Sequence, residues 1–248
     1  MTNSRTLVIG DIHGGLKALK QVLQRAEVTP RDQLIFLGDY VDGWPDTANL
    51  IDFLIKLKQT HNCIFLKGNH EDLFLNWYEN KTENKLWLKN GGESTFAIYS
   101  NLNKEVVNQH ITFLKDLDLY HIDQKNRLFI HGGFTHLRGL ENEFYQDLFY
   151  WDRTLWEMAI ALDPSLPIDH IRYPKRLRYY KEIFIGHTTV QEIGENTPQN
   201  FANIWNVDTG AGFGHKLSIL DVDTKQFWQS DDLKTLYTDS GRVFIPRV

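Results

Sequence analysis

The sequence contains a single cysteine, Cys63, among its 248 residues. One cysteine cannot form a disulfide within the chain, and this composition is typical of proteins in a reducing compartment. We therefore expect a cytoplasmic protein. Cys63 lies in the apolar run CIFL, which predicts a buried thiol that acts as a small hydrophobic side chain.

Long apolar runs and a surplus of basic residues are also missing. No stretch is long enough to span a membrane, and the first apolar run, TLVI, is too short for the core of a secretory signal. Lys and Arg number 27 against 32 Asp and Glu, which gives a net charge of −5. Nucleic-acid binders usually carry a basic excess, so we expect neither general nucleic-acid binding nor membrane association.

What the sequence does contain is a repeated unit of strand, turn and helix. Each unit starts with a short apolar run that ends at a glycine or a polar residue, and residues with helical spacing follow. Asp46 is a candidate N-cap for the second helix. Alternating strands and helices predict parallel pairing. The three apolar runs are TLVI (6–9), LIFL (34–37) and CIFL (63–66).

Two more apolar runs follow, LFI at 128–130 and IFI at 183–185. Between them, the segment at about 136–182 is rich in aromatic and basic residues, and Phe144 to Leu162 has a helical pattern. We expect a single domain over residues 1–248, in which this segment forms a cap or groove wall; the alternative is a solvated helix and a connector. The stretches IWNVDTG and KLSILDVDTKQFWQ predict antiparallel strands.

Polar side chains of the metal-ligand type follow all five apolar runs. In open α/β sheets this carboxyl edge is where ligands bind. The set offers carboxylate, imidazole and amide donors without a thiolate, which suits Mn²⁺, Fe²⁺ or Zn²⁺ better than a structural zinc site. Six ligands are too many for one ion that keeps a position open for water, and they fit two ions that share a carboxylate. The six are Asp11, His13, Asp39, Asn69, His131 and His187.

The motif series resembles the calcineurin-like metallophosphoesterases. More narrowly, it is similar to the phosphoprotein phosphatase family and its small bacterial serine/threonine phosphatases. The family fold is an α/β sandwich of two mixed β-sheets flanked by helices, with metals at the carboxyl ends of strands. The resemblance rests on GDIHG (10–14), GDYVDG (38–43), GNHE (68–71), HGG (131–133) and GH (186–187), and less specifically on NGGEST (90–95), YWDRTLW (150–156) and VDTGAGFGHKLSILDVD (207–223).

The resemblance implies a role for each motif position. It implies two divalent metal ions, with Mn²⁺ the expected metal and iron or zinc as alternatives. Asp11 and His13 would bind the first ion, Asp39 would bridge both, and the second ion would be completed by Asn69, His131 and His187.

The same resemblance makes His70 the general acid and Asp42 the carboxylate that orients it. Two adjacent cations lower the pKa of a bridging water to roughly neutral, so a hydroxide is available for in-line attack on phosphorus. A histidine paired with a carboxylate can protonate the leaving oxygen near neutral pH.

Gly43 departs from the family pattern. The phosphoprotein phosphatases usually have GDxVDRG here, and their arginine grips the substrate phosphate, whereas Gly43 has no side-chain donor. Another arginine could take its place. Arg153, in YWDRTLW, is the first candidate for substrate binding; the others are Arg138, Arg172, Arg176 and Arg178.

Three functions follow from the sequence. The main hypothesis is a phosphomonoesterase of the serine/threonine protein phosphatase type, whose partner is a phosphorylated protein or a small phosphate ester. The alternative is a hydrolase of diadenosine polyphosphates or other nucleotides, because the basic-aromatic run at 170–181 could stack a base. A non-catalytic binding protein with the same fold is third. The oligomeric state stays open.

Overall fold

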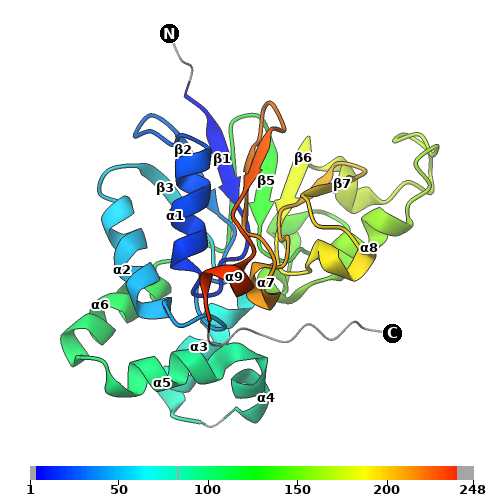
Figure 1. Ribbon diagram of the computed structural model, residues 1–248. Helices are drawn as coiled ribbons and strands as arrows, with labels where there is room; N and C mark the ends of the chain where they lie inside the picture. The colour runs from blue at the N-terminus through cyan, green and yellow to red at the C-terminus, as the bar shows by residue number, and fades with distance from the viewer. Residues whose placement is uncertain (1–3, 83, 239–248) are drawn as a thin grey trace.

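The computed structural model describes residues 4–82 and 84–238, which form two five-stranded mixed sheets packed face to face (Figure 1). The strand order is β10-β9-β1-β2-β3 in the first sheet and β4-β5-β6-β8-β7 in the second. The strands are β1 (Thr6–Ile9), β2 (Gln33–Phe36), β3 (Asn62–Phe65), β4 (Tyr120–Ile122), β5 (Arg127–Ile130), β6 (Glu182–Ile185), β7 (Gln199–Phe201), β8 (Ile204–Asn206), β9 (Ser218–Asp221) and β10 (Phe227–Gln229).

Helices flank both sheets, so the predicted fold class is confirmed (Figure 1). The α-helices are α1 (Leu16–Arg25), α2 (Thr47–Leu57), α3 (Asn69–Asn80), α4 (Lys85–Trp87), α5 (Glu93–Asn101), α6 (Lys104–Lys115), α7 (Leu148–Trp151), α8 (Thr154–Ala161) and α9 (Leu233–Leu236). The π-helical segment η1 (Leu88–Gly92) joins α4 to α5, and 3₁₀ turns lie at η2 (Leu140–Asn142), η3 (Lys175–Arg178), η4 (Val190–Ile193) and η5 (Ala211–Phe213).

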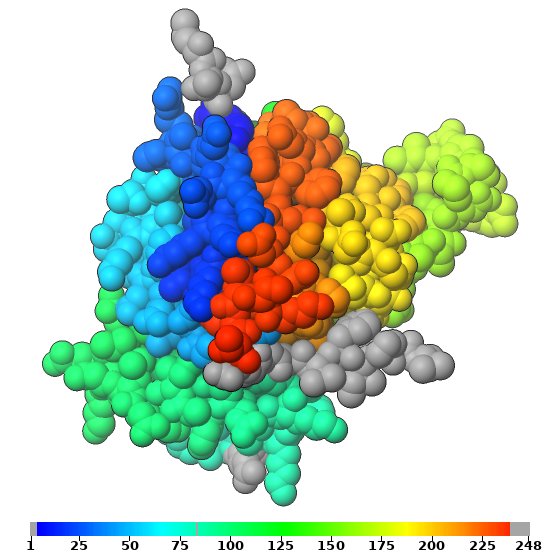
Figure 2. Space-filling view, viewed as in Figure 1, coloured from blue at the N-terminus to red at the C-terminus, as the bar shows by residue number. Residues whose placement is uncertain are grey.

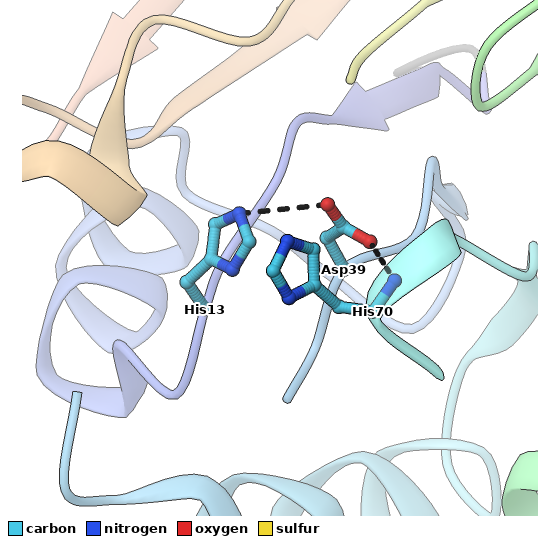
Figure 3. A group of neighbouring side chains, drawn as sticks. All are labelled: His13, Asp39 and His70. Carbon is cyan, nitrogen blue, oxygen red and sulfur yellow. Dashed lines mark hydrogen bonds and ion pairs between the residues drawn. The ribbon is translucent and has the colours of Figure 1, made fainter. Parts of the chain in front are cut away.

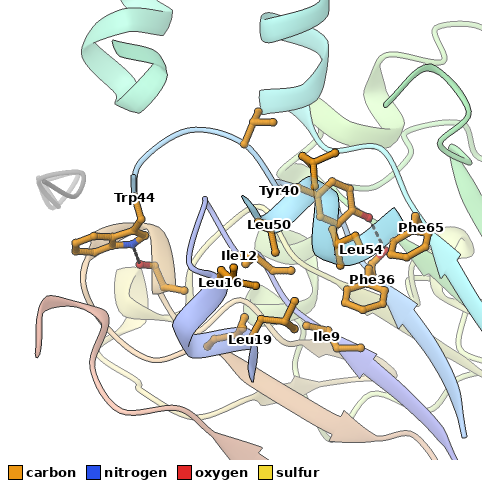
Figure 4. Close-up of a cluster of buried hydrophobic side chains, with 14 of the residues drawn as sticks. Ile9, Ile12, Leu16, Leu19, Phe36, Tyr40, Trp44, Leu50, Leu54 and Phe65 are labelled. Atoms are coloured by element: carbon orange, nitrogen blue, oxygen red, sulfur yellow. Dashed lines mark hydrogen bonds between the residues drawn. The ribbon is translucent and has the colours of Figure 1, made fainter. Parts of the chain in front are cut away.

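Alternate residues of each strand face opposite sides of its sheet, and this divides the core into three clusters. Val8 of β1 faces the second sheet and shares a cluster with Phe129 and Phe184, whose rings stack with centroids 4.9 Å apart. Ile9 faces the other way, onto α1 and α2 (Figure 4). On the outer face of the second sheet, Trp156 of α8 belongs to the third cluster.

The predicted strands and their parallel pairing are confirmed in both sheets. In the first, Ile9 pairs with Phe36, and Phe36 pairs with Phe65, so β1, β2 and β3 end level with one another. In the second, β5, β6 and β8 are parallel neighbours. Five of these six strands are the five apolar runs of the sequence and the sixth lies in IWNVDTG, so the residues that follow them gather at one edge.

The segment from α3 to α6 forms a helical layer at one end of the sheets, in cyan and green at the bottom of Figures 1 and 2. A buried polar group connects its helices to α2. Nε2 of His110 lies 3.0 Å from a carboxylate oxygen of Asp52, and its Nδ1 lies 2.8 Å from the hydroxyl of Tyr99. His110 therefore has a structural role.

The helical prediction for Phe144 to Leu162 is confirmed only in part. Two short helices, α7 and α8, occupy this stretch instead. The Asp152 carboxylate accepts hydrogen bonds from the backbone N–H groups of Thr154 and Leu155, so it starts a new helix and breaks the pattern. Asp46 does precede α2, but its side chain bonds to Asn49 and Tyr237 rather than capping the backbone.

The carboxyl-terminal strands agree with prediction only in part. β9 and β10 form the expected antiparallel hairpin, and β7 is antiparallel to β8. β8 also pairs in parallel with β6, because it enters the second sheet after a crossover. Within the described ranges, no helix is long and apolar enough to cross a membrane.

Candidate metal centre

The predicted ligands meet at the carboxyl ends of the parallel strands. Each comes from the residues directly after a strand, or from the first residue of α3 after β3. All six are buried: Asp11, His13, Asp39, Asn69, His131 and His187. The structure therefore brings together the complete set that the sequence singled out.

Asp39 contacts several of its neighbours in the site, and Figure 3 shows its two oxygens directed toward His13 and the backbone of His70. Its Oδ2 is 3.5 Å from Nε2 of His13, and its Oδ1 is 3.4 Å from Nε2 of His131. Oδ1 also accepts a hydrogen bond of 3.0 Å from the backbone N–H of His70. The two oxygens face different histidines, as a carboxylate between two cations requires.

Backbone carbonyls orient two of these histidines. Nδ1 of His131 lies 2.8 Å from the carbonyl oxygen of Leu37, and Nδ1 of His13 lies 3.3 Å from that of Val41. A carbonyl oxygen only accepts, so each Nδ1 carries a proton, and each Nε2 is the ring nitrogen directed toward Asp39, where it could bind a metal. This second contact fixes the tautomer that a metal needs.

Strained backbone is concentrated at the site. Nine described residues other than glycine have positive φ, and four of them lie here: His13 at 51°, Asp39 at 54°, Asp42 at 71° and His187 at 68°. Left-handed backbone is unfavourable for side chains with a Cβ and persists where the surroundings impose it.

Glu71 imposes the conformation at Asp39. Its Oε2 accepts from the backbone N–H groups of Asp39 and Gly68, each at 2.9 Å, and its Oε1 accepts from Tyr40 at 2.7 Å and Val41 at 3.1 Å. Burial, and then the charge of Asp39, raise the pKa of Glu71 to about 7. Glu71 is not among the residues predicted from the sequence. The pattern that could have indicated it is the glutamate of GNHE, which lies three residues after the N-cap glycine of α3.

Buried charge of both signs gathers around the ligands. Burial lowers the pKa of His131, but Asp39 and Asp11 outweigh it and raise the value to about 9. Burial raises the pKa of Asp39, but His131 and His70 outweigh it and hold the pKa well below its usual range. For Asp11, burial and then the carboxylate of Asp208 raise the pKa well above the usual value. A cation between these carboxylates would offset their burial and their mutual repulsion.

His187 provides the clearest test of fit. Its Nε2 is buried and has no hydrogen-bond partner among the described residues. Burial first, and then Arg153 and His131, lower its pKa well below the usual value, which favours the neutral ring that binds metals. One donor atom each from Asp39, His131 and His187 lie within 4.8 Å of one another, and so do donors of a second group. The second group is His13, Asp39 and His70.

The predicted acid pair is also present. Nδ1 of His70 lies 2.6 Å from Oδ2 of Asp42, and both side chains are buried. The His70 ring meets that of His13 edge-on, with centroids 4.7 Å apart. His70 thus stands beside the ligand set, held from its far side by a carboxylate.

A pocket of about 410 Å³ opens onto the ligands. The segment at 136–182 contributes Trp151 and Arg153 to its wall; the basic-aromatic run at 170–181 contributes none of the described lining residues. Arg176 bonds instead to the carbonyl oxygen of Phe134. Among the five candidate arginines, Arg153 is the one found in the described lining. The aromatic lining residues are Trp87, Trp151 and Phe213.

Two glycine-containing motifs acquire definite roles. Gly43 has φ of 87°, and its backbone N–H donates to the carbonyl oxygen of Gly91 over 3.0 Å. In the DTGAGFG run, a Cβ on Gly212 would fall 2.5 Å from the ring of His13, so this turn packs directly on a predicted ligand. In the same run, Oδ1 of Asp208 accepts from the backbone N–H of Gly210, as in a tight turn, and Asp208 also lines the pocket.

A two-sheet sandwich with buried carboxylate, imidazole and amide donors at its strand ends defines a metal-dependent hydrolase. The model of the calcineurin-like phosphoesterases matches residues 4–218. The chain belongs to this family, and the protein is a metal-dependent phosphoester hydrolase. Membership implies a dinuclear site for divalent metal ions, which the residues present fit.

Named relatives and solved structures resemble this chain over most of its length. The chain is 27% identical over 237 residues to the bis(5'-nucleosyl)-tetraphosphatase PrpE [asymmetrical] of Oceanobacillus iheyensis, covering 89% of each chain. It is 25% identical to the enzyme of the same name in Bacillus mycoides, covering 96% of each. Among solved structures, a protein serine/threonine phosphatase from Saccharomyces cerevisiae matches with a TM-score of 0.58 at 16% identity, covering 92% of this chain and 80% of that one. This last similarity concerns the fold alone.

Replacing Glu71 tests whether its carboxylate holds the Asp39 loop. In Glu71→Gln, the amide NH₂ faces two backbone donors, so we expect unfolding free energy to fall by roughly 2–4 kcal/mol. Metal affinity should fall as well. Urea unfolding without metal and titration with Mn²⁺ measure the two effects. Glu105→Gln, in the first turn of α6 and exposed, is the control; equal results for both variants would contradict the role.

Proposed function

We propose that the protein hydrolyses bis(5'-nucleosyl) tetraphosphates with two divalent metal ions. The sequence favoured a protein phosphatase, but the named relatives that cover most of the chain support the nucleotide alternative. The observation that carries the proposal is the pocket wall beside the metal centre. Trp151 is 40% exposed there, and its ring lies 6.2 Å, centroid to centroid, from that of His187. An exposed indole beside the phosphate site suits a nucleobase.

The six buried ligands divide naturally around Asp39. Asp11 and His13 would hold one ion, and Asp39 would contact both. The remaining three would hold the second ion: Asn69, His131 and His187. When bound, two such ions supply an activated water and neutralise charge on the phosphoryl oxygens. Mn²⁺ suits this mixture of oxygen and imidazole donors.

His70 and Asp42 would handle the leaving group. Asp42 accepts a hydrogen bond from Nδ1 of His70, which orients the ring and leaves Nε2, with its proton, on the side of the ligands. His70 would give that proton to the leaving oxygen. We propose this pair as an acid unit and not as metal ligands, since Nδ1 is already engaged.

Arg153 is the proposed contact for substrate phosphate. Its Nη1 donates to the carbonyl oxygen of His187 at 3.0 Å and to Oγ1 of Thr188 at 2.9 Å, so the guanidinium is held beside a proposed ligand. A planar, permanently charged group in this place can bind phosphate oxygens. Arg153 would supply the phosphate contact that Gly43, without a side chain, cannot make.

The protein phosphatase function remains the second candidate, supported by the spelling of GDYVDG and GNHE. Its substrate would be a phosphorylated serine or threonine presented on a protein. A cytoplasmic location, which rests on the cysteine content, stays a prediction.

A direct substrate comparison tests the proposal. With Mn²⁺, we expect kcat/KM for diadenosine tetraphosphate to exceed that for a phosphoserine peptide by at least about 100-fold. Chromatography of the products separates unequal cleavage, which gives a nucleoside triphosphate and a nucleoside monophosphate, from equal cleavage, which gives two nucleoside diphosphates. Trp151→Ala should raise KM for the dinucleotide and leave KM for p-nitrophenyl phosphate, which has no base, unchanged. Preference for the peptide would establish the second candidate.

Asp39→Asn tests the shared carboxylate. Loss of one charge between two cations should weaken both, so we expect metal content well below that of the wild type and turnover lower by at least about 100-fold. Metal analysis and steady-state rates in Mn²⁺ are the measurements. Asp32→Asn, a buried carboxyl at the opposite end of β2, is the control. Full metal content with near-normal turnover in Asp39→Asn would exclude the two-metal arrangement.

Arg153→Ala tests the phosphate contact. We expect KM for diadenosine tetraphosphate to rise roughly tenfold, because a charged hydrogen bond to the substrate is lost. Arg153→Lys should recover part of the loss. Arg176→Ala, whose guanidinium bonds to backbone in the same segment, should lower stability without changing KM. Kinetics of Arg153→Ala that match those of Arg176→Ala would assign Arg153 to structure alone.

A further inference from the structure

Trp87 contacts the acid pair from outside the ligand set. Its indole Nε1 donates to Oδ2 of Asp42 over 2.7 Å, and Nδ1 of His70 lies 2.6 Å from the same oxygen. Trp87 is 1% exposed, and Asp42 is fully buried. Oδ1 of Asp42 has no hydrogen-bond partner among the residues described. The two bonds that orient this carboxylate therefore share one oxygen.

The NGGEST motif makes room for the indole. A Cβ on Gly92 would fall 2.4 Å from both Cε2 and Nε1 of Trp87, closer than any real contact. Gly92 itself has φ of −64°, so its backbone would accept alanine and the constraint comes from the ring of Trp87. On the other side, the side chain of Asn84 accepts from the backbone N–H of Trp87 and starts α4.

The same motif also holds the backbone beside Asp42. Oγ1 of Thr95 accepts from the N–H of Asp42 at 2.9 Å, and the carbonyl oxygen of Gly91 accepts from the N–H of Gly43 at 3.0 Å. Gly91 has φ of 105°, which only glycine adopts without strain. Residues 84–95 thus contact the Asp42 loop through the indole of Trp87, the hydroxyl of Thr95 and the carbonyl oxygen of Gly91.

We propose that Trp87 is a positioning residue for proton donation by His70. The indole N–H would keep Oδ2 of Asp42 directed at Nδ1 of His70. As the P–O bond breaks, the proton on Nε2 passes to the leaving oxygen, and Nδ1–H remains bonded to Asp42. Without the indole, the carboxylate can rotate about its own axis and the ring loses its alignment. This inference rests on the proposed function, in which His70 is the acid.

The test compares two substrates that differ only in leaving group. Phenyl phosphate releases a phenol with a pKa of about 10, as in tyrosine, and needs a proton more than p-nitrophenyl phosphate does. For Trp87→Phe in the metal-loaded enzyme, we expect kcat for phenyl phosphate to fall roughly tenfold more than kcat for p-nitrophenyl phosphate, with KM and metal content unchanged. His70→Asn should show a larger loss of the same kind.

A double variant separates positioning from structure. If Trp87 acts through His70, His70→Asn/Trp87→Phe should discriminate between the two substrates no further than His70→Asn alone. The inference would be overturned if the discrimination of the two single variants multiplied in the double variant. It would also be overturned if Trp87→Phe lowered kcat equally for both substrates. If His70→Asn does not discriminate between the substrates, the acid role itself fails, and the inference fails with it. A leaving-group effect in His70→Asn without one in Trp87→Phe would overturn the role of Trp87 and leave the acid role of His70 intact.

Two further variants cover a failure of Trp87→Phe to fold. Replacement of Trp87 by benzothienylalanine keeps the ring and removes only the N–H, and Gly92→Ala keeps the N–H and displaces the ring. Both should reproduce the leaving-group effect. Trp44→Phe is the matched control, because its buried indole donates to the carbonyl oxygen of Ala211 at 2.8 Å and not to the acid pair (Figure 4). A leaving-group effect in Trp44→Phe equal to that in Gly92→Ala would contradict the proposal.

Discussion

Four backbone N–H groups converge on the carboxylate of Glu71, and the geometry of the site depends on them. They belong to the loops after β2 and β3, so a single side chain sets the distance between two strand ends. Left-handed backbone such as that of Asp39 costs roughly 1–2 kcal/mol. Hydrogen bonds contribute roughly 0.5–1.5 kcal/mol each, so the four to Glu71 are together enough to impose it. Asp39 can then present both oxygens to the histidines on either side.

The site is built as much from backbone as from side chains. Carbonyl oxygens of Leu37 and Val41 orient two histidines, and backbone N–H groups bind Glu71 and Asp39. These groups lie at the ends of strands, where the sheet ladder leaves them without a partner of their own. The edge of a parallel sheet therefore supplies backbone groups that orient the site, and the sequence needs to provide only the side chains that bind metal. The burial of so many carboxylates remains unfavourable until cations enter, which links metal binding to stability.

The sequence predicts the strands and the ligand set because both depend on local signals. An apolar run followed by Gly-Asp or His marks a strand end, and parallel pairing brings such ends together. Trp87 and Asp42 are 45 residues apart, and nothing local to either indicates their contact. The same limit explains the arginines: only the tertiary fold shows that Arg176 binds a carbonyl oxygen and Arg153 lines the pocket. The prediction of one continuous helix at 144–162 missed a local break. Asp152 accepts hydrogen bonds from the backbone at the start of α8, and the apolar pattern does not reveal this.

Gly43 connects the acid pair to the question of substrate. The φ of 87° at this position would be unfavourable for an arginine. The glycine instead lets the loop approach Gly91, and the neighbouring segment brings Trp87 onto Asp42. Under the proposed function, phosphate recognition would fall to Arg153, which lines the pocket as the exposed Trp151 does. A cation and an aromatic face side by side fit a phosphate chain that ends in a nucleoside better than a phosphorylated side chain, which offers no base to stack. Gly43, which departs from the family pattern, is therefore consistent with the dinucleotide substrate that we propose.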